Sequence, residues 1–444
     1  MNREIYRIAV PAIVANVTIP LLGLLDTAIA GHLGAESFIG AVAVGAMIFN
    51  LIYFSFGFLR MSTSGLTAQQ CGRGDDSGSV RVLKEALAVS LALGVVVIAL
   101  QWPLQWLLLA VIAPSREVAA LSQQYFHLCV WGAPPILMMM AVKGWMLGMQ
   151  DSRGPMKISI AVNVINTVVS LVCVYVFDMG FMGIAVGTLV SEYAALCYSV
   201  LLLWRSFPSH VRMLLGGSVR VRVSRRYFTV SGDIFVRSLL LTLVHLAVVS
   251  IGARSGDLML AVNSLMQQLN TFFAYFLDGI AFAGEALVGK YYGAGDMKNM
   301  HRCVRRLFLW ATVLALSFAA IYAFPRGLFS LLTDQTSVVS AAMDYRWWCA
   351  ALPLAGMAAF VWDGVFIGLT RSRGMLVAVA VAVALFFGLY FAMPSSLGNH
   401  RLWLAFVAYL FTRGVVQTVI FYAPSKAPSK GRFEATEKVK NSLF

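Results

Sequence analysis

The chain has 444 residues, of which 59% are hydrophobic and 12% charged, and its formal net charge is +14. Soluble domains carry about a quarter charged residues, so the composition excludes a soluble globular protein and indicates a polytopic membrane protein. The positive charge does not indicate a nucleic-acid-binding protein, because Lys and Arg fall in short segments between apolar runs and not on one soluble face.

Twelve apolar runs follow one another along the chain, and each is close to or above the roughly 20 residues that a helix needs to cross a bilayer. We therefore predict an all-α protein with twelve transmembrane helices. Several runs are long enough to require tilt, and we expect kinks at Pro11, Pro20, Pro103 and at Pro134 with Pro135. The runs cover approximately 7–30, 40–69, 85–112, 119–149, 157–177, 181–204, 228–252, 258–289, 307–331, 338–369, 374–393 and 402–422.

The distribution of Lys and Arg predicts the orientation of these helices. If the N-terminus lies inside, the inner segments hold 25 of the 34 Lys and Arg residues. The outer segments then hold only Arg116, Arg254, Arg326 and Arg401, and five cations lie within the spans. Because cytoplasmic loops are enriched in Lys and Arg, both termini are predicted to be cytoplasmic.

The chain also contains an internal repeat with an offset of 220 or 221 residues. The run from Leu66 to Asp75 (LTAQQCGRGD) returns from Leu287 to Asp296 (LVGKYYGAGD), and the pattern that begins at Gly144 returns at Gly364. Six spans per half is an even number, so the halves share one orientation and are related by an axis along the membrane normal. We predict four parts: an N-terminal six-helix lobe (1–205), a cytoplasmic linker (206–226), a C-terminal six-helix lobe (227–422) and a disordered cytoplasmic tail (423–444).

One carboxylate, Asp26, stands inside the first apolar run. An ionised Asp in hydrocarbon is costly and usually marks a functional site, and Thr27 beside it can hydrogen-bond the carboxyl group. The alternative is a side chain that reaches the membrane surface from the end of the helix. Apart from Arg346, no basic residue of the other spans is placed at its depth, so Asp26 is the candidate for proton coupling.

A polar stripe runs along the fifth span. Asn163, Asn166 and Ser170 are spaced three and then four residues apart, which places them on one face of a helix. Their side chains either bridge to neighbouring helices or line a cavity opposite Asp26, and the sequence leaves both readings open.

Further charges lie in the inner halves of the second, seventh and eighth spans. Asp278 and Glu285 are seven residues apart on one face of the eighth span. Asp233 and Arg237 are four apart on the seventh and can pair along the helix. Together with Arg60 of the second span, they are predicted to form a cytoplasmic gate or structural ion pairs. Coupling through Asp278, Glu285 or Asp363 is the alternative to coupling through Asp26.

No motif for catalysis, cofactor binding or metal binding is recognisable. The run from Gly284 to Lys290 fits the first seven positions of a phosphate-binding loop, but Tyr291 stands where Ser or Thr should follow, and the run ends an apolar helix. The six cysteines contain no C-x-x-C pair, and no H-x-x-x-H pair or Ser-His-Asp group is present. We expect no enzyme activity, no cofactor and no metal site.

Several runs of residues resemble the multidrug and toxic compound extrusion family. One is GLLDTAIAGHLG from Gly23 to Gly34, around Asp26. The run FLRMSTSGLTAQ from Phe58 to Gln69, the segment from Asp233 to Leu240 and Leu277-Asp278-Gly279 are similar to its DNA-damage-inducible F (DinF) branch. The resemblance covers nearly the whole chain except the tail.

The resemblance implies a monomeric antiporter in a bacterial inner membrane, with two six-helix bundles around a V-shaped cleft. It implies export of small cationic or amphiphilic substrates in exchange for protons or sodium, with membrane lipids but no nucleic acid as partners. By position, the family's first-helix carboxylate corresponds to Asp26 and its fifth-helix asparagine to Asn166. The fifth-helix acid of many relatives corresponds to Ser170, which leaves the N-terminal lobe with one acid. A lipid-linked precursor flippase, a membrane-embedded enzyme and a channel are the alternatives.

Overall fold

The computed structural model describes residues 1–112, 114–216 and 223–423 of the chain, and these residues contain helices but no strand. Twelve helices within them are long and apolar enough to cross a membrane, and each overlaps one predicted run. The all-α membrane fold is therefore confirmed. Residues 217–222 of the predicted linker and 424–444 of the predicted tail lie outside the described residues.

The first half of the chain forms six spans from eleven elements. These are α1 (Asn2–Gly31), α2 (Glu36–Ser55), α3 (Phe58–Arg73), α4 (Asp76–Ala99), α5 (Gln101–Ile112), α6 (Arg116–Cys129), the 3-10 turn η1 (Val130–Gly132), α7 (Ala133–Gly148), α8 (Arg153–Leu171), the π-helical turn η2 (Val172–Val176) and α9 (Phe181–Ser206). Helices α2 and α3 form one span, as do α6 and α7 with η1, and α8 continues into η2. A short helix, α10 (Pro208–Leu215), follows in the predicted linker.

The second half repeats this order and also supplies six spans. Its elements are α11 (Arg225–Arg254), α12 (Asp257–Gly293), α13 (Met297–Tyr322), α14 (Arg326–Leu332), α15 (Thr336–Met343), α16 (Arg346–Gly368), α17 (Ser372–Ala392), the 3-10 turn η3 (Ser395–Leu397) and α18 (His400–Tyr422). The single helix α12 corresponds to the α2–α3 span, and the short α14 corresponds to α5.

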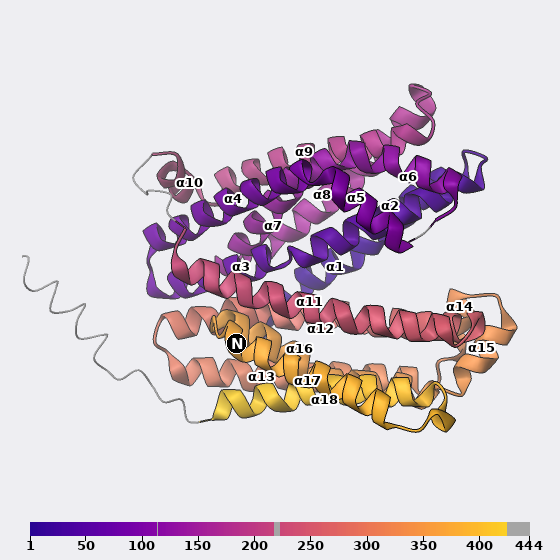
Figure 1. Cartoon of the computed structure of the whole chain (residues 1–444). Coiled ribbons are helices and arrows are strands. Elements are labelled where there is room, and N and C mark those ends of the chain that lie inside the picture. Colours follow the sequence, from indigo (N-terminus) through magenta and orange to yellow (C-terminus); the bar gives the residue numbers. More distant parts are fainter. Residues whose placement is uncertain (113, 217–222, 424–444) are drawn as a thin grey trace, which may run out of the picture.

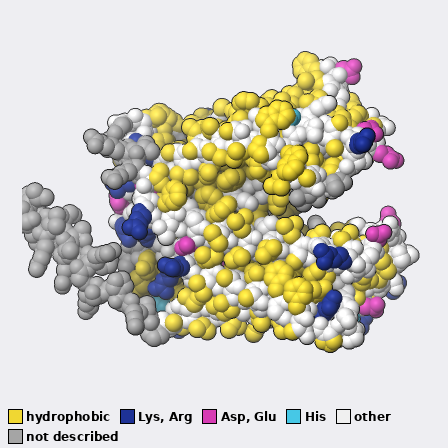
Figure 2. Space-filling view, viewed as in Figure 1, with side chains coloured by type: hydrophobic (Ala, Val, Ile, Leu, Met, Phe, Trp, Pro, Cys, Tyr) yellow, Lys and Arg dark blue, Asp and Glu magenta, His cyan; other side chains and the backbone are white. Residues whose placement is uncertain are grey.

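The two halves form two helical bundles that are arranged as a V (Figure 1). They touch at the end that carries the N-terminus and α10, where α1 and α3 of the first bundle pack on α12 of the second. They separate toward the end that carries α14 and α15. Figure 2 shows the surface hollowed between the bundles at this open end, and a group of Lys and Arg side chains at the closed end.

The structure corrects three of the predicted spans. The predicted run 85–112 contains the spanning helix α4 and then the separate α5, and runs 307–331 and 338–369 likewise divide near Pro325 and Tyr345. Pro103 was expected to kink a helix, but it lies in the first turn of α5, where its missing N–H breaks no helical hydrogen bond. By contrast, Pro134 and Pro135 follow η1 and begin α7, so a break occurs there as expected.

Equivalent residues cap equivalent helices in the two halves. Asp75 precedes α4 and its carboxylate accepts the Gly78 N–H at 2.8 Å, while Asp296 precedes α13 and accepts the Asn299 N–H at 3.0 Å. These backbone hydrogen bonds favour the ionised carboxylate and lower the pKa of both Asp75 and Asp296 below the usual value. The two acids are 221 residues apart, which is the offset of the repeat.

Helices α3 and α12 cross with a reciprocal close contact. A Cβ added at Gly72 would overlap the carbonyl group of Lys290, and a Cβ added at Gly293 would overlap that of Gln69. Gly72 corresponds to Gly293 and Gln69 to Lys290 at the repeat offset, so the two contacts are related by the pseudo-twofold axis. Only glycine lets the two helix backbones approach this closely.

We expect Gly72→Ala and Gly293→Ala to separate the bundles at the closed end. Overpacking of this kind costs about 1–3 kcal/mol. Distances between spin labels on the ends of α3 and α12 should therefore increase. Gly232→Ala is the matched control, because no atom lies within 4 Å of an added Cβ at this position. If Gly72→Ala and Gly293→Ala give the same distance distribution as the wild type and Gly232→Ala, the close contact is contradicted.

Candidate functional site

Asp26 lies inside the N-terminal bundle, where its side chain is buried. The residue is 5% exposed, and its Oδ1 atom has no hydrogen-bond partner among the described residues. Ile29 and Ala30 of the same helix pack with Tyr125 and Cys129 of α6. Tyr125 and Cys129 also interact electrostatically with Asp26. The carboxyl group therefore faces a largely apolar interior with weakly acidic neighbours, and none of the described cations pairs with it.

The residues predicted to contact Asp26 have other partners. The Thr27 hydroxyl donates to the Gly23 carbonyl oxygen at 2.7 Å, one turn back on α1. This is a local hydrogen bond, because a threonine hydroxyl on a helix readily reaches the carbonyl four residues earlier.

The polar stripe of α8 bridges helices. Asn163 Nδ2 donates to the Thr18 carbonyl oxygen of α1 at 2.7 Å, and Asn166 Nδ2 donates to the Thr188 hydroxyl of α9 at 3.1 Å. Asn166 Oδ1 and Ser170 Oγ are buried without a partner in the described structure. The stripe therefore joins α8 to two neighbours, which is the bridging interpretation of the sequence, and two of its polar oxygens have no partner among the described residues.

A second acid, Glu192, also lies inside this bundle. It is on α9, it is 8% exposed, and its Oε2 atom has no partner in the described part of the chain. The expectation that the N-terminal lobe has one intramembrane acid is therefore wrong. The signal was present in the sequence, because Glu192 is a single acid within the apolar run 181–204, as Asp26 is within the first run.

Arg60 and Glu285 form an ion pair between the two bundles. The guanidinium of Arg60, on α3, donates to both carboxylate oxygens of Glu285, on α12, at 3.0 and 3.2 Å. Arg60 also stacks over the Phe282 ring at 4.1 Å from its centroid. Glu285 is 1% exposed, so the pair is held in a protein interior where charge-assisted bidentate bonds are strong. Of the predicted gate residues, these two meet across the interface.

Arg237 and Asp233 are held within the C-terminal bundle and do not pair with each other. Asp363 of α16 accepts from Arg237, from Arg413 Nη2 at 2.8 Å and from Gln417 Nε2 at 2.7 Å. Asp233 Oδ2 instead accepts from the Ser372 hydroxyl at 2.7 Å. The predicted contact four residues apart on α11 is thus replaced by contacts with other helices.

Asp278 lies between these two groups of charges. It is two turns before Glu285 on α12, and it interacts electrostatically with Arg60, Glu285, Asp363 and Arg237. No hydrogen bond or ion pair of its carboxyl group occurs in the described structure. We name the set of Arg60, Arg237, Arg413, Asp278, Glu285 and Asp363 the central charge cluster; it contains three cations and three acids.

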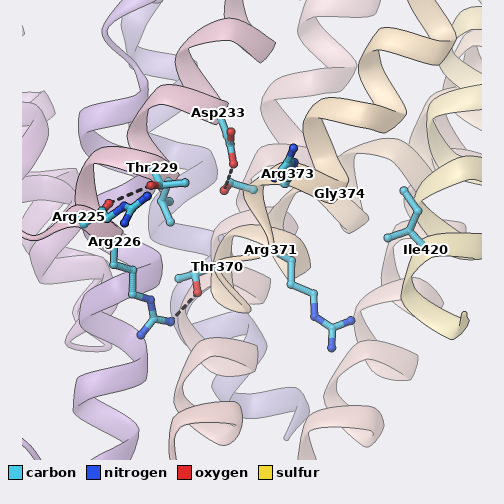
Figure 3. A pocket seen from close by; sticks show the side chains of 11 residues that line it. Arg225, Arg226, Thr229, Asp233, Thr370, Arg371, Arg373, Gly374 and Ile420 are labelled. Atoms are coloured by element: carbon cyan, nitrogen blue, oxygen red, sulfur yellow. Dashed lines mark hydrogen bonds between the residues drawn. The ribbon is translucent and has the colours of Figure 1, made fainter. Parts of the chain in front are cut away.

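Further hydrogen bonds join the two bundles between this cluster and the closed end of the molecule. Gln69 Nε2 of α3 donates to the Gly368 carbonyl oxygen at 2.9 Å, and Arg226 Nη2 donates to Gln69 Oε1 at 2.8 Å. A cavity of about 630 Å³ lies beside this contact and is lined by Arg225, Arg226, Asp233 and the α16–α17 turn (Figure 3). The interface at the closed end is therefore polar and rich in arginine.

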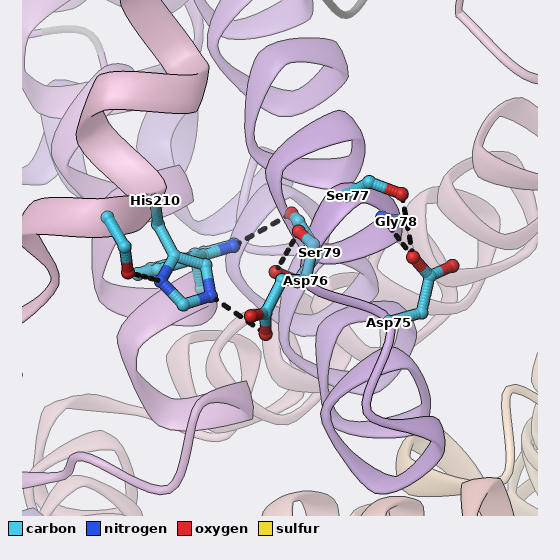
Figure 4. Close-up of polar contacts among 8 residues, drawn as sticks. Asp75, Asp76, Ser77, Gly78, Ser79 and His210 are labelled. Atoms are coloured by element: carbon cyan, nitrogen blue, oxygen red, sulfur yellow. Dashed lines mark hydrogen bonds and ion pairs between the residues drawn. The ribbon is translucent and has the colours of Figure 1, made fainter.

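The linker helix is attached to the N-terminal bundle at the same end. His210 Nε2 of α10 lies 3.2 Å from Asp76 Oδ1 at the start of α4, next to the Asp75 cap (Figure 4). In addition, the Ser224 hydroxyl at the start of α11 donates to Glu85 Oε2 of α4 at 2.9 Å. Both ends of the linker are thus bonded to α4. Among the described residues, no three His, Cys, Asp or Glu side chains are grouped so that they could hold a metal ion.

Comparisons with known proteins agree with this architecture. Residues 11–172 and 234–392 match the family model described as MatE. The chain is 34% identical over 95% of its length to "DNA damage-inducible protein F" of Escherichia coli (strain K12), of which it covers 92%. It is 24% identical over 90% of its length to "Probable multidrug resistance protein NorM" of Rhizobium meliloti (strain 1021), of which it covers 88%.

Solved structures show the same fold. "Outward-facing conformation of a multidrug resistance MATE family transporter of the MOP superfamily" superposes with a TM-score of 0.78 at 18% identity, covering 94% of each chain. "Crystal structure of MATE in the bent conformation" has a TM-score of 0.78 at 18% identity and covers 100% of this chain and 97% of that one.

Proposed function

Because the chain belongs to the MatE family of transporters, we propose that it is a secondary active antiporter that exports small organic cations or amphiphilic toxic compounds in exchange for protons. The observation that carries the proposal is Asp26, a buried carboxyl group that has no ion pair with any described residue and lies in a bundle that borders the cleft. Such a group can hold a proton or attract a cation, but it cannot easily remain charged and alone.

We propose that the closed end of the molecule faces the cytoplasm and that the chain lies in a bacterial inner membrane as a monomer. The closed end carries the N-terminus and the group of Lys and Arg side chains in Figure 2, and inner loops are enriched in these residues. In this orientation the cleft between the bundles opens outward. The conformation is then the one that releases substrate and takes up external protons.

The exchange follows from the charge of Asp26. As a carboxylate it attracts a cationic substrate, and as a neutral acid it loses this attraction. A proton that enters from the open cleft would therefore displace the substrate. Exchange of one proton for one monovalent cation moves no net charge across the membrane, so the pH difference drives it. Each tenfold difference in proton concentration supplies about 1.4 kcal/mol.

Helix α1 is built to respond to this change. Its first half packs on α12 through Ala9 and Ile13, which lie against Gly279, whereas its second half packs in the N-terminal bundle. Pro20 removes one backbone hydrogen bond between these halves, and Asn163 holds the Thr18 carbonyl nearby. We propose that protonation of Asp26 lets the outer half of α1 bend about this point and narrow the cavity in the bundle.

The test is export of a fluorescent cationic dye from liposomes that contain the purified protein. A proton gradient alone should drive dye movement, and a sodium gradient alone should not. Movement driven by sodium in the absence of a proton gradient would replace the proton with sodium in this scheme. Movement driven by neither gradient would contradict antiport.

A lipid-linked precursor flippase remains the second candidate, since it has a similar two-lobe plan. A row of unpaired cations along the cleft would favour it, because the diphosphate of such a lipid is anionic. In this chain the arginines of the central charge cluster each contact an acid: Arg60 contacts Glu285, and Arg237 and Arg413 contact Asp363. This pairing favours the cation exporter.

We propose that Arg60 and Glu285 form the cytoplasmic gate, and we predict that Glu285→Gln opens it. Loss of a hydrogen bond to a charged group costs about 1.5–3 kcal/mol, and every 1.4 kcal/mol changes a two-state population about tenfold. Labels at the inner ends of α3 and α12 should therefore show a second, longer distance. The charge exchange Arg60→Glu with Glu285→Arg should restore the short distance.

Glu36→Gln is the matched control for the gate, because Glu36 is an exposed acid outside the interface. It should leave the distance distribution and the transport rate unchanged. If Glu285→Gln also leaves both unchanged, the Arg60–Glu285 pair does not hold the inner side closed, and the hydrogen bonds of Gln69 and Arg226 must carry the closure.

A further inference from the structure

We infer that Glu192, with Tyr53 and Cys129, forms a second proton-binding site in the N-terminal bundle, at the break between α6 and α7. This site is separate from the proposed role of Asp26. That Glu192 can bind a proton does not depend on the proposed proton coupling; only a role of that proton in transport does.

The carboxyl group of Glu192 is packed against the backbone of the break. A Cβ added at Gly132, the last residue of η1, would overlap Glu192 Oε2, so the carboxyl group occupies the space that the missing Cβ leaves. The next residue on α9, Tyr193, donates its hydroxyl to the Trp131 carbonyl oxygen at 2.9 Å. Two successive residues of α9 therefore contact two successive residues of the break.

The hydroxyl group of Tyr53 is a polar neighbour that could serve this carboxyl group. Tyr53 lies near the end of α2 and interacts electrostatically with Glu192 and with Cys129. Its hydroxyl oxygen is buried without a hydrogen-bond partner in the described residues, as is Glu192 Oε2. Buried polar oxygens are normally hydrogen-bonded, so these two neighbouring groups are suited to share a proton or a water molecule.

No cation balances Glu192 among the elements that pack on it in the described structure. From α6, Cys129 faces it, and its Sγ atom donates to the Ala185 carbonyl oxygen at 3.7 Å. The one charged residue of α7, Lys143, donates to Ser159 at 3.1 Å and lies eleven residues beyond Gly132, about 16 Å along the helix. From α8, the two cations are Arg153 and Lys157, which are exposed at the start of that helix.

An isolated carboxylate in such a site carries a large desolvation cost, and the group avoids it by holding a proton. Ionisation would require a donor at Oε2, which the site can provide by rotating Tyr53 toward it or by admitting water at the Gly132 break. The α6–α7 span passes here through the 3-10 turn η1, in which the Ala133 N–H bonds to the Val130 carbonyl oxygen, and such an irregular turn is a place where a helix can bend. The proton on Glu192 and the geometry of the α6–α7 break are therefore linked.

Infrared difference spectroscopy of the purified protein in lipid tests the site directly. A protonated carboxyl group has a C=O stretching band that is separate from the bands of carboxylates and amides. When the pH is raised from acid to alkaline, the wild type should lose two components of this band, one for each carboxyl group. The component of Glu192 should be absent from Glu192→Gln, and the component of Asp26 should be absent from Asp26→Asn. Identical spectra for Glu192→Gln and the wild type at every pH would overturn the inference.

Tyr53→Phe is the second variant, for use if Glu192→Gln does not fold. Removal of the hydroxyl should shift the component assigned to Glu192 and leave the component assigned to Asp26 in place; an unchanged band would overturn the site. Failure of proton-driven dye export would contradict the proposed function, but it would leave this result standing. The two ideas are therefore tested separately.

Discussion

Asp26→Asn is expected to abolish export driven by a proton gradient, with a loss of at least a hundredfold in rate, about 2.8 kcal/mol or more at 1.4 kcal/mol per factor of ten. Asn has the shape of the protonated acid but cannot release a proton, so the cycle should stop in one state. Binding of the substrate should survive in part for the same reason. The measurement is dye export from liposomes, at a protein level and monodispersity equal to those of the wild type.

Asp178→Asn is the matched control, because Asp178 is an exposed acid of the same bundle. Its backbone has φ of +51°, a conformation that Asn adopts readily, so the variant should export normally. If Asp26→Asn exports at the wild-type rate, Asp26 is a structural residue. Coupling would then have to be sought at Asp278, Glu285 or Asp363.

Asp363→Ala is expected to cause the largest loss of stability. The carboxylate accepts from Arg237, Arg413 and Gln417, and all three residues are buried. Its removal leaves two buried guanidinium groups without their acid, and breaking a buried pair in this way costs about 3–5 kcal/mol. Proteins of this kind have a total stability of only about 5–15 kcal/mol, so most of the protein should be lost on heating at temperatures that the wild type survives.

The heating experiment follows the amount of monodisperse protein after incubation. Asp233→Ala is the control for the loss of one acid in the same bundle, because Asp233 accepts one hydrogen bond, from the neutral Ser372 hydroxyl. Its effect should be about 1 kcal/mol. Equal thermal stability of the two variants would show that the two arginines find other partners when Asp363 is absent.

The fold could be predicted from the sequence because hydropathy and the repeat are strong signals in a membrane protein. Each apolar run had to be helical, since backbone groups in lipid must be satisfied within the segment. The reciprocal contacts of Gly72 with Lys290 and of Gly293 with Gln69 now give the repeat a physical meaning. The boundaries were less certain. Helix α5 is as apolar as its neighbours, so composition alone could not separate it from α4.

The partners of the charged residues could be predicted only in part. Asp233 and Arg237 are close in sequence, and a contact between them was the reasonable prediction. The structure gives each a partner on another helix, and these partners follow from how the helices pack, which a single sequence does not contain. Arg60 and Glu285 are 225 residues apart and meet across the interface, as the gate hypothesis required.

Glu192 shows why the candidate site was incomplete. Ser170 stands in the fifth span where the resemblance leads one to expect an acid, and this position alone predicts a single acid in the N-terminal lobe. The second acid lies on the following span and reaches the same bundle interior from another side. A survey of every acid within an apolar run would have found it, because burial of a carboxyl group in such a run is costly wherever it occurs.

The most direct test of the account drives the exchange with a substrate gradient instead of a proton gradient. Liposomes that contain the protein are loaded with a cationic substrate, no ion gradient is imposed, and the external and internal pH are followed. The account predicts that substrate leaving the liposomes draws protons inward with the wild type, with no such change for Asp26→Asn, and with equal rates in the presence and absence of sodium. Substrate movement without a pH change, or a pH change that Asp26→Asn retains, would contradict proton antiport through Asp26.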